Sequence, residues 1–143
     1  MRPDHAHDLV AKSAGLLAIG GRVGIDVVSI PRLARMLDGR RDRMMRRWFT
    51  NEEQAYCGRR DDRAATTLAG KEAVMKVLGT GHRGIGWHDV EIHRRADGAP
   101  LVVLHGAAVA KAAAHAVEIE ISLCHEGDLG IALAYGKAVA DGS

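Results

Sequence analysis

Two acidic residues and a lysine occupy positions where apolar or neutral residues would serve a fold better. Glu72 and Lys76 lie four residues apart in an apolar segment that predicts a helix, so they share one helix face. They form either an exposed ion pair or a phosphate site, in which a carboxylate holds Mg²⁺ and a lysine neutralises phosphate oxygens. Asp26 interrupts a β-branched strand pattern, although Asp is depleted in strands. It is either an outward-facing strand residue or a second carboxylate for the same ion.

Two other motifs could carry chemistry, and each also has a simpler structural interpretation. Residues 79–84, GTGHRG, contain the glycine spacing of a dinucleotide-binding loop, but they close a predicted helix instead of opening one. Gly79 and Gly81 would still let backbone amides approach a phosphate closely. His125 lies just past a predicted strand end and is either a turn histidine or a functional residue. Adjacent strand residues point to opposite faces, so Cys124 and His125 are not expected to pair as nucleophile and base.

Strands and helices of recognisable pattern surround these residues. Thr50 and Glu53 have the spacing of a capping box, and Gly79 ends the most strongly predicted helix. Residues 40–47 are a basic stretch, and residues 58–63 are a polar loop. The pattern predicts strands at 22–30, 88–95, 101–104, 118–124 and 130–135, and helices at 31–38, 49–57, 64–78 and 106–116. This order predicts an α+β domain with a mostly antiparallel sheet packed against helices.

Length and composition restrict the class of protein. With 143 residues, 47% apolar and 27% charged, the chain is typical of one soluble domain. We expect a flexible N-terminal extension at 1–21, the domain at 22–137 and a C-terminal tail at 138–143. A net charge of +2 does not by itself indicate nucleic acid, and no apolar run is long enough for a membrane span. The two cysteines make no disulfide framework, which favours the cytoplasm.

Five segments, in order, resemble the holo-(acyl-carrier-protein) synthases, the short single-domain 4′-phosphopantetheinyl transferases. The resemblance covers roughly residues 22 to 136. The segments are GIDVVSIPRL, FTNEEQAYC, LAGKEAVMKVLGTGHRGIGWHDVEI, DGAPLVVLHGAA and ISLCHEGDLGIALA. The resemblance implies that the phosphopantetheine arm of coenzyme A passes to a serine of an apo acyl carrier protein, with release of 3′,5′-ADP. It also implies a homotrimer with active sites in the clefts between subunits, and a role in fatty-acid or other lipid biosynthesis.

The resemblance also assigns roles to residues. Asp26 and Glu72 match the carboxylates that hold Mg²⁺, and Lys76 matches the lysine that faces the pyrophosphate. His125 matches a histidine close to the coenzyme's phosphates. Glu72, Lys76 and His125 are thus the implied catalytic residues, and the implied coenzyme contacts are Lys71, Lys76, Gly79, Gly81 and His125. Arg32 matches an arginine that contacts the carrier, and Arg35 lies three residues further along the same predicted helix.

One departure from the family pattern leaves alternatives open. The family places an arginine at the position of Thr67, so one cationic contact to the coenzyme is missing here. This favours, as an alternative, a weakened member that binds coenzyme A or carrier protein without efficient turnover. A small nucleic-acid binder that uses the arginines of 40–47 is a third hypothesis. It is the weakest, because the only aromatic residues beside that cluster are Trp48 and Phe49.

Overall fold

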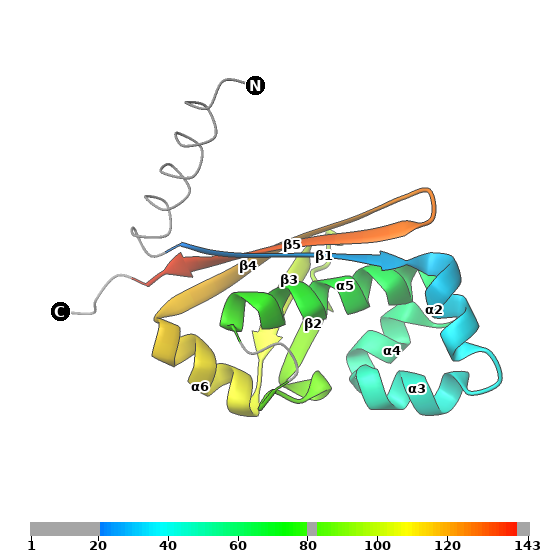
Figure 1. Ribbon diagram of the computed structural model, residues 1–143, viewed down its shortest axis with the longest axis horizontal. Coiled ribbons are helices and arrows are strands. Elements are labelled where there is room, and N and C mark those ends of the chain that lie inside the picture. Colours follow the sequence, from blue (N-terminus) through cyan, green and yellow to red (C-terminus); the bar gives the residue numbers. More distant parts are fainter. Residues whose placement is uncertain (1–20, 80–82, 140–143) are drawn as a thin grey trace, which may run out of the picture.

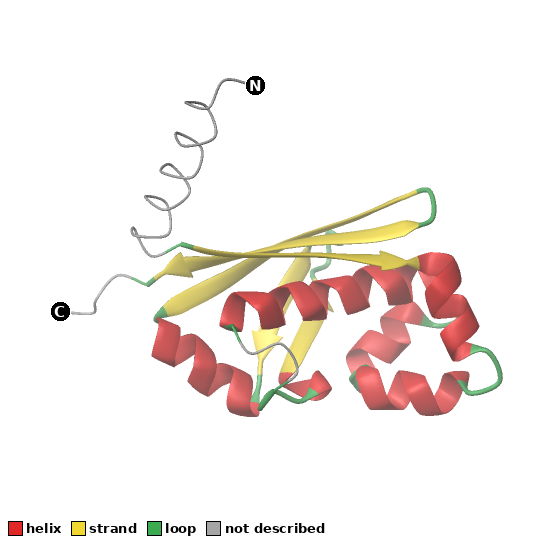
Figure 2. Cartoon of the chain, viewed as in Figure 1, coloured by secondary structure: helices red, strands yellow, loops and turns green. Residues whose placement is uncertain are grey.

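A computed structural model describes residues 21–79 and 83–139, and it confirms the predicted α+β fold (Figures 1 and 2). A short 3₁₀ helix, Trp87–Asp89, precedes the first strand of the hairpin. The other elements in chain order are β1 (Arg22–Ser29), α2 (Ile30–Leu37), α3 (Arg41–Trp48), α4 (Asn51–Cys57), α5 (Asp61–Leu78), β2 (Val90–Arg94), β3 (Pro100–Leu104), α6 (Gly106–His115), β4 (Val117–Glu126) and β5 (Leu129–Ala138). None of the helices within the described ranges is both long and apolar enough to cross a bilayer.

Both sheets are antiparallel, as the sequence pattern predicts. Strands β1, β5 and β4 form a three-stranded sheet in that order, and β2 pairs with β3 in a separate hairpin. Asp26 on β1 lies opposite Ala132 on β5, which in turn lies opposite Leu123 on β4. In Figure 1 the described helices all lie on one side of the three-stranded sheet. The opposite face of that sheet is left uncovered by them.

Helix α5 runs along the covered face of the sheet and is the centre of the fold. Its side chains are buried around most of the helix, from Ala64 to Leu78, which is the pattern of a core helix. Close approach to β1 depends on Gly24, where an added Cβ would lie only 2.1 Å from the Ala73 carbonyl oxygen. Any larger residue would push β1 and α5 apart. The helix ends at Gly79, whose φ of 86° is in the left-handed region that favours glycine.

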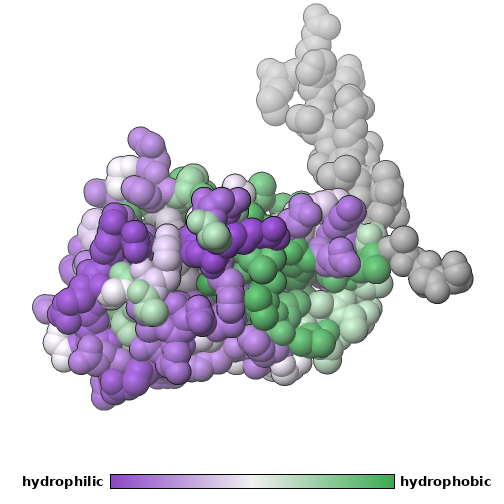
Figure 3. Space-filling model, turned by 180° about the vertical axis from the view of Figure 1, so that it is seen from behind, coloured by the Kyte–Doolittle hydropathy of each residue, from purple (hydrophilic) through white to green (hydrophobic). Residues whose placement is uncertain are grey.

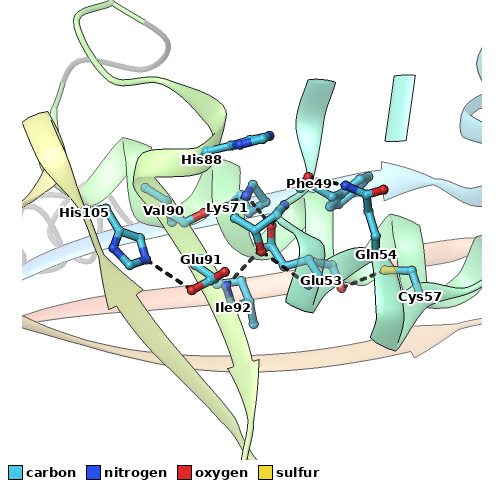
Figure 4. Close-up of polar contacts among 12 residues, drawn as sticks. Phe49, Glu53, Gln54, Cys57, Lys71, His88, Val90, Glu91, Ile92 and His105 are labelled. Carbon is cyan, nitrogen blue, oxygen red and sulfur yellow. Dashed lines mark hydrogen bonds and ion pairs between the residues drawn. The ribbon is translucent and has the colours of Figure 1, made fainter. Parts of the chain in front are cut away.

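A fully buried ion pair joins α4, α5 and β2 (Figure 4). The Lys71 ammonium lies 2.6 Å from Glu53 Oε1 and donates a second 2.6 Å hydrogen bond to the Val90 carbonyl. The other carboxylate oxygen of Glu53 accepts from the Ile92 amide at 2.9 Å. Glu53 also accepts from the Thr50 amide, so the predicted capping box is present. The same carboxylate therefore caps α4 and anchors both α5 and β2.

The structure corrects three sequence-based predictions of secondary structure. The basic stretch is partly a helix, α3, whose apolar Met45 and Trp48 are three residues apart and buried. Charged residues dominate the rest of that helix and hide its amphipathic pattern. Helix α5 begins at Asp61 instead of 64, because Asp61 and Asp62 belong to its first turn. His125 lies inside β4, since the strand continues to Glu126 through pairing with β5.

Candidate functional site

Asp26, Glu72 and Lys76 come together where α5 crosses β1. Outward-facing Ile25 and Val27 flank Asp26, so strand alternation turns Asp26 toward the helix. The Lys76 ammonium donates to the Ile25 carbonyl at 2.7 Å and lies 3.1 Å from Asp26 Oδ1. The ion pair of Lys76 is thus with Asp26 on the strand, and not the Glu72 pair that helix spacing alone suggested. The Lys76 side chain remains 53% exposed, so its amino group can also meet a ligand.

The two carboxyl groups of this cluster interact directly. Burial raises the pKa of Glu72 to about 8, and the hydrogen bond and negative charge of Asp26 act in the same direction, while Lys76 opposes them. Asp26 Oδ2 is buried and has no hydrogen-bond partner among the residues that the structure describes. Two ionised carboxylates offer only acceptor atoms to each other, so a proton or a cation must lie between them. Oxygen donors of this kind fit a hard divalent cation such as Mg²⁺.

A cavity of about 220 Å³ opens beside Glu72. Arg32 of helix α2 reaches its wall, so a cationic side chain lies in the same cavity as the candidate metal ligand. Ser29 caps this helix by accepting from the Arg32 amide at 3.3 Å, which fixes where the helix starts. Arg35 is exposed on the last turn of the same helix. The lining residues are Val27, Val28, Ser29, Arg32, Leu33, Met36, Leu68 and Glu72.

His125 does not join this cluster within one chain. It lies on β4, the far edge of the sheet from β1, and lines a different cavity with Thr66 and Arg63 of α5. Helix α5 contacts all three strands of the sheet and contributes lining residues to both cavities. Within one chain, Asp26 and His125 therefore lie on opposite edge strands of the three-stranded sheet.

The structure also corrects the assignment of Lys71 as a coenzyme contact. Its side chain is completely buried, and its ammonium is engaged by Glu53 and the Val90 carbonyl (Figure 4). No solvent-exposed ligand can reach that nitrogen in this arrangement. Gly79 is exposed at the end of α5, whereas the assignment of Gly81 falls outside the described residues.

The arginines of the basic stretch line a hollow on the surface, which the sequence analysis did not predict. The hollow has a volume of about 570 Å³, and Arg59, from the turn after α4, completes it. Figure 3 shows that the end of the molecule carrying α2 to α4 is mainly hydrophilic on this face. Arg43 and Arg46 lie three residues apart on α3, and this spacing would have been the signal if the basic stretch had been predicted as a helix. The lining residues are Gly39, Arg40, Arg41, Asp42, Arg43, Arg46 and Arg59.

Known proteins share both the sequence and the fold. The model of the 4′-phosphopantetheinyl transferase superfamily matches residues 22–134. The holo-[acyl-carrier-protein] synthase of Myxococcus xanthus is 41% identical over 114 residues, which cover 77% of this chain and 89% of that protein. The structure of the Mycobacterium tuberculosis acyl carrier protein synthase superposes with a TM-score of 0.66 at 34% identity, covering 82% of this chain and 96% of that one.

A further solved relative contains a ligand. The Helicobacter pylori holo-[acyl-carrier-protein] synthase, crystallised in complex with coenzyme A, superposes with a TM-score of 0.73 at 25% identity. The superposition covers 80% of this chain and 99% of that chain. The family match extends over most of the chain and includes every strand and helix that positions Asp26, Glu72, Lys76 and His125. The chain therefore belongs to the 4′-phosphopantetheinyl transferase superfamily and is an enzyme of its holo-[acyl-carrier-protein] synthase family.

Proposed function

We propose that this enzyme transfers the 4′-phosphopantetheine arm of coenzyme A to a serine of an apo acyl carrier protein and releases 3′,5′-ADP. The observation that carries the proposal is the pair of facing carboxyl groups, Asp26 and Glu72, beside the exposed ammonium of Lys76. The test is to incubate the full chain with coenzyme A, Mg²⁺ and an apo carrier, and to weigh the carrier by mass spectrometry. A carrier heavier by one phosphopantetheine is the expected product, and an unchanged carrier would contradict the proposal.

Magnesium would be held by Asp26 and Glu72. Two features of these residues fit Mg²⁺. Asp26 Oδ2 is buried and has no hydrogen-bond partner within the described residues, and both candidate ligands are carboxylates, which offer the oxygen atoms that this ion prefers. When bound, the ion supplies Lewis-acid stabilisation of charge on the pyrophosphate oxygens. The two carboxylates contribute by lying on rigid elements, a sheet strand and a core helix, so that their separation is set before the substrate binds.

The reaction itself is a displacement at phosphorus. The serine oxygen of the carrier forms a bond to the phosphorus that bears the pantetheine arm, and the bond from that phosphorus to the bridging oxygen breaks. The serine hydroxyl gives its proton to solvent water, and the electron pair of the broken bond leaves on the oxygen of 3′,5′-ADP. Such reactions need alignment and charge neutralisation more than a covalent intermediate. The Lys76 ammonium is positioned to neutralise the pyrophosphate, because the strand contacts hold it beside the carboxylates while half of the side chain stays exposed.

Lys76→Ala should lower turnover tenfold or more while changing the free energy of unfolding by less than about 1 kcal/mol. The small structural cost follows from the exposure of the Lys76–Asp26 pair, and tenfold in rate corresponds to about 1.4 kcal/mol. Steady-state rates and chemical denaturation of the same variant measure the two effects. If the variant were stable and had normal turnover, Lys76 would form only a surface ion pair and would not contribute to the reaction.

We also propose that the functional unit is a homotrimer in which each active site lies between two copies. Two observations support this. The first is that His125 and Glu72 line different cavities of one chain, and that His125 and Asp26 lie on opposite edge strands of the sheet. The second is the uncovered face of the main sheet, where Val23, Ile25 and Val27 are 52%, 57% and 52% exposed. Leu133 and Tyr135 on β5 lie opposite Ile25 and Val23 and extend the same apolar face. Contiguous exposed apolar surface of this kind marks an interface between proteins.

Mixed oligomers test this arrangement. Asp26→Ala and His125→Ala should each lose most activity, and co-refolding equal amounts should restore about a quarter of the native activity. Random assembly puts an intact Asp26 on half of the copies and an intact His125 on half of their neighbours, and the product of the two fractions is about a quarter. Light scattering before mixing gives the oligomeric state. A mixture no more active than the separate variants would place both residues in one chain's site or outside it.

The carrier is proposed to dock on helix α2. Carrier proteins of this class are acidic, and Arg32 and Arg35 present positive charge next to the cavity that contains Glu72. Charge-driven docking speeds encounter and weakens as salt screens it. Docking on this helix would bring the accepting serine near the carboxylates. The free cysteines Cys57 and Cys124 are consistent with a reaction in the reducing cytoplasm.

Arg32→Glu should raise the KM for the carrier about tenfold or more and leave coenzyme A binding little changed. Arg35→Glu, further from the cavity, should show the same selectivity with a smaller effect. Steady-state kinetics with each substrate varied in turn, at low and high salt, separates the two constants. Equal loss for both substrates would indicate a damaged fold. No loss for the carrier would move the docking surface to the hollow lined by Arg40, Arg43 and Arg46.

The alternative is a weakened member that binds coenzyme A or a carrier without efficient turnover. The observation that favours it is Thr67, which stands where the family places an arginine and is only 1% exposed. Its hydroxyl accepts a 3.7 Å hydrogen bond from the Cys57 thiol, so this position faces the core and offers no cation to a ligand. The carrier assay distinguishes the two, because a binding protein leaves the carrier mass unchanged even with excess coenzyme A and Mg²⁺.

A further inference from the structure

The last turn of helix α5 has a hydrogen-bond partner for each of its four final carbonyl groups. An α-helix leaves its last four carbonyls without partners inside the helix, so other groups must supply them. The Gly79 amide donates to the carbonyls of Met75 and Lys76, at 3.0 and 3.1 Å. The remaining two carbonyls, of Val77 and Leu78, are bound by side chains from other elements of the fold.

Those two side chains belong to Arg22 and His115. Arg22, at the start of β1, donates from Nε to the Val77 carbonyl at 2.6 Å. His115 is the last residue of α6, and its Nε2 lies 3.0 Å from the Leu78 carbonyl. Because a carbonyl only accepts, this nitrogen carries the proton. Basic side chains are favoured at this end of a helix because they complement its dipole. The end of α5 is therefore held by two separate elements, a strand and a second helix (Figure 1).

Gly79 leaves the space that these two side chains occupy. A Cβ added there would lie 2.9 Å from a terminal guanidinium nitrogen of Arg22 and 3.7 Å from His115 Nε2. The φ of 86° at this residue is also in the left-handed region that favours glycine. The glycine that ends α5 therefore serves both the turn of the backbone and the close approach of the Arg22 side chain.

Arg22 binds the helix next to the residue that carries the candidate catalytic ammonium. Lys76 directly precedes Val77, and its Nζ donates to the Ile25 carbonyl at 2.7 Å and lies 3.1 Å from Asp26 Oδ1. Strand β1 and the last turn of α5 are thus joined by hydrogen bonds in both directions. Arg22 donates from the strand to the helix, and Lys76 donates from the helix to the strand. The position of the half-exposed Lys76 side chain therefore depends on how the end of α5 is held against β1.

We propose that Arg22 and His115 are positioning residues for Lys76, because they cap the end of α5 and so hold the Lys76 ammonium beside Asp26. The inference rests on the proposed function, in which Lys76 neutralises the pyrophosphate. Neither residue has to touch a substrate, since each acts on the backbone of the helix turn. A displacement of about 1 Å is enough to remove much of the effect of a catalytic group. Arg22 should have the larger effect, because it binds the residue next to Lys76, whereas His115 binds one residue further along.

A double-mutant cycle on the full chain separates positioning from capping alone. Arg22→Met removes the donor and keeps most of the side chain, and it should lower kcat about fivefold with an unchanged KM for the carrier. In a Lys76→Ala background the same replacement should lower kcat less than about twofold, because the group that Arg22 positions is gone. Arg22→Lys, which keeps a donor, should restore part of the rate, and His115→Ala should show the same pattern as Arg22→Met with a smaller effect. Arg95→Met is the matched control, since Arg95 is an exposed arginine just past β2, and it should change neither constant.

A crystal structure of Arg22→Met gives a second measurement that needs no turnover. The Lys76 ammonium should move away from Asp26, to well beyond the 3.1 Å of the native chain. An unchanged contact would overturn the inference, and so would equal fold losses of kcat in the two backgrounds, because Arg22 would then act independently of Lys76. His115→Ala serves both measurements if Arg22→Met does not fold. If the native chain leaves the carrier unmodified, the transferase proposal fails, and the crystal structure by itself then decides whether Arg22 positions Lys76.

Discussion

Replacing Asp26 by alanine should lower the rate of carrier modification by about a hundredfold or more and leave the fold intact. The expected loss follows from the several kcal/mol by which a bridging cation stabilises developing charge, since each 1.4 kcal/mol is about tenfold in rate. The fold should tolerate the change because the variant loses the ion pair with the half-exposed Lys76, which contributes little to stability, and Asp26 Oδ2 has no hydrogen-bond partner within the described residues. Removing one of two facing carboxylates also relieves their mutual repulsion.

Two measurements check this result. The initial rate of Asp26→Ala should be lower than that of the native chain at every Mg²⁺ concentration. The melting temperature of the native chain should rise when Mg²⁺ is added, and that of the variant should not. Glu72→Gln should behave like Asp26→Ala in both measurements. Glu52→Ala, which removes an exposed carboxylate from α4, is the matched control and should change neither. Near-normal rates for Asp26→Ala in Mg²⁺ would show that this carboxylate is not a metal ligand.

The second large effect concerns stability. Lys71→Met should reduce the free energy of unfolding by about 3–5 kcal/mol, because it leaves the Glu53 carboxylate buried without its counter-charge. Such a loss is a large fraction of the roughly 5–15 kcal/mol that stabilises a typical domain. Lys111→Met on helix α6 is the matched control for a lysine that is not fully buried, and it should cost less than about 1 kcal/mol.

A second replacement identifies the cause. Glu53→Gln combined with Lys71→Met removes both charges and keeps an amide oxygen for the Thr50 or Ile92 amide. The double variant should therefore be more stable than Lys71→Met alone, as denaturant unfolding of the two proteins would measure. If Lys71→Met were as stable as the native chain but bound coenzyme A weakly, the structural interpretation of Lys71 would be wrong and the coenzyme contact inferred from the sequence would be right.

The fold class followed from local sequence patterns, because strand alternation, capping residues and glycine turns act within a few residues. Thr50 and Glu53 predicted the start of α4, and Gly79 predicted the end of α5. Patterns failed where packing against other segments decides the structure. Helix α3 buries only Met45 and Trp48 among arginines, and β4 extends through His125 only because β5 pairs with it.

The sequence by itself determined which residue types were available for a phosphate and metal site, and the helical spacing of Glu72 and Lys76. Only the tertiary structure decided their partners. Lys76 reaches Asp26 because Gly24 lets β1 approach α5, a contact between segments about fifty residues apart. Lys71 and Glu72 are neighbours in sequence, yet one is sealed in the core and the other borders a cavity. The physical reason is that successive residues of a helix point in different directions, and only the packed surroundings decide which direction meets solvent.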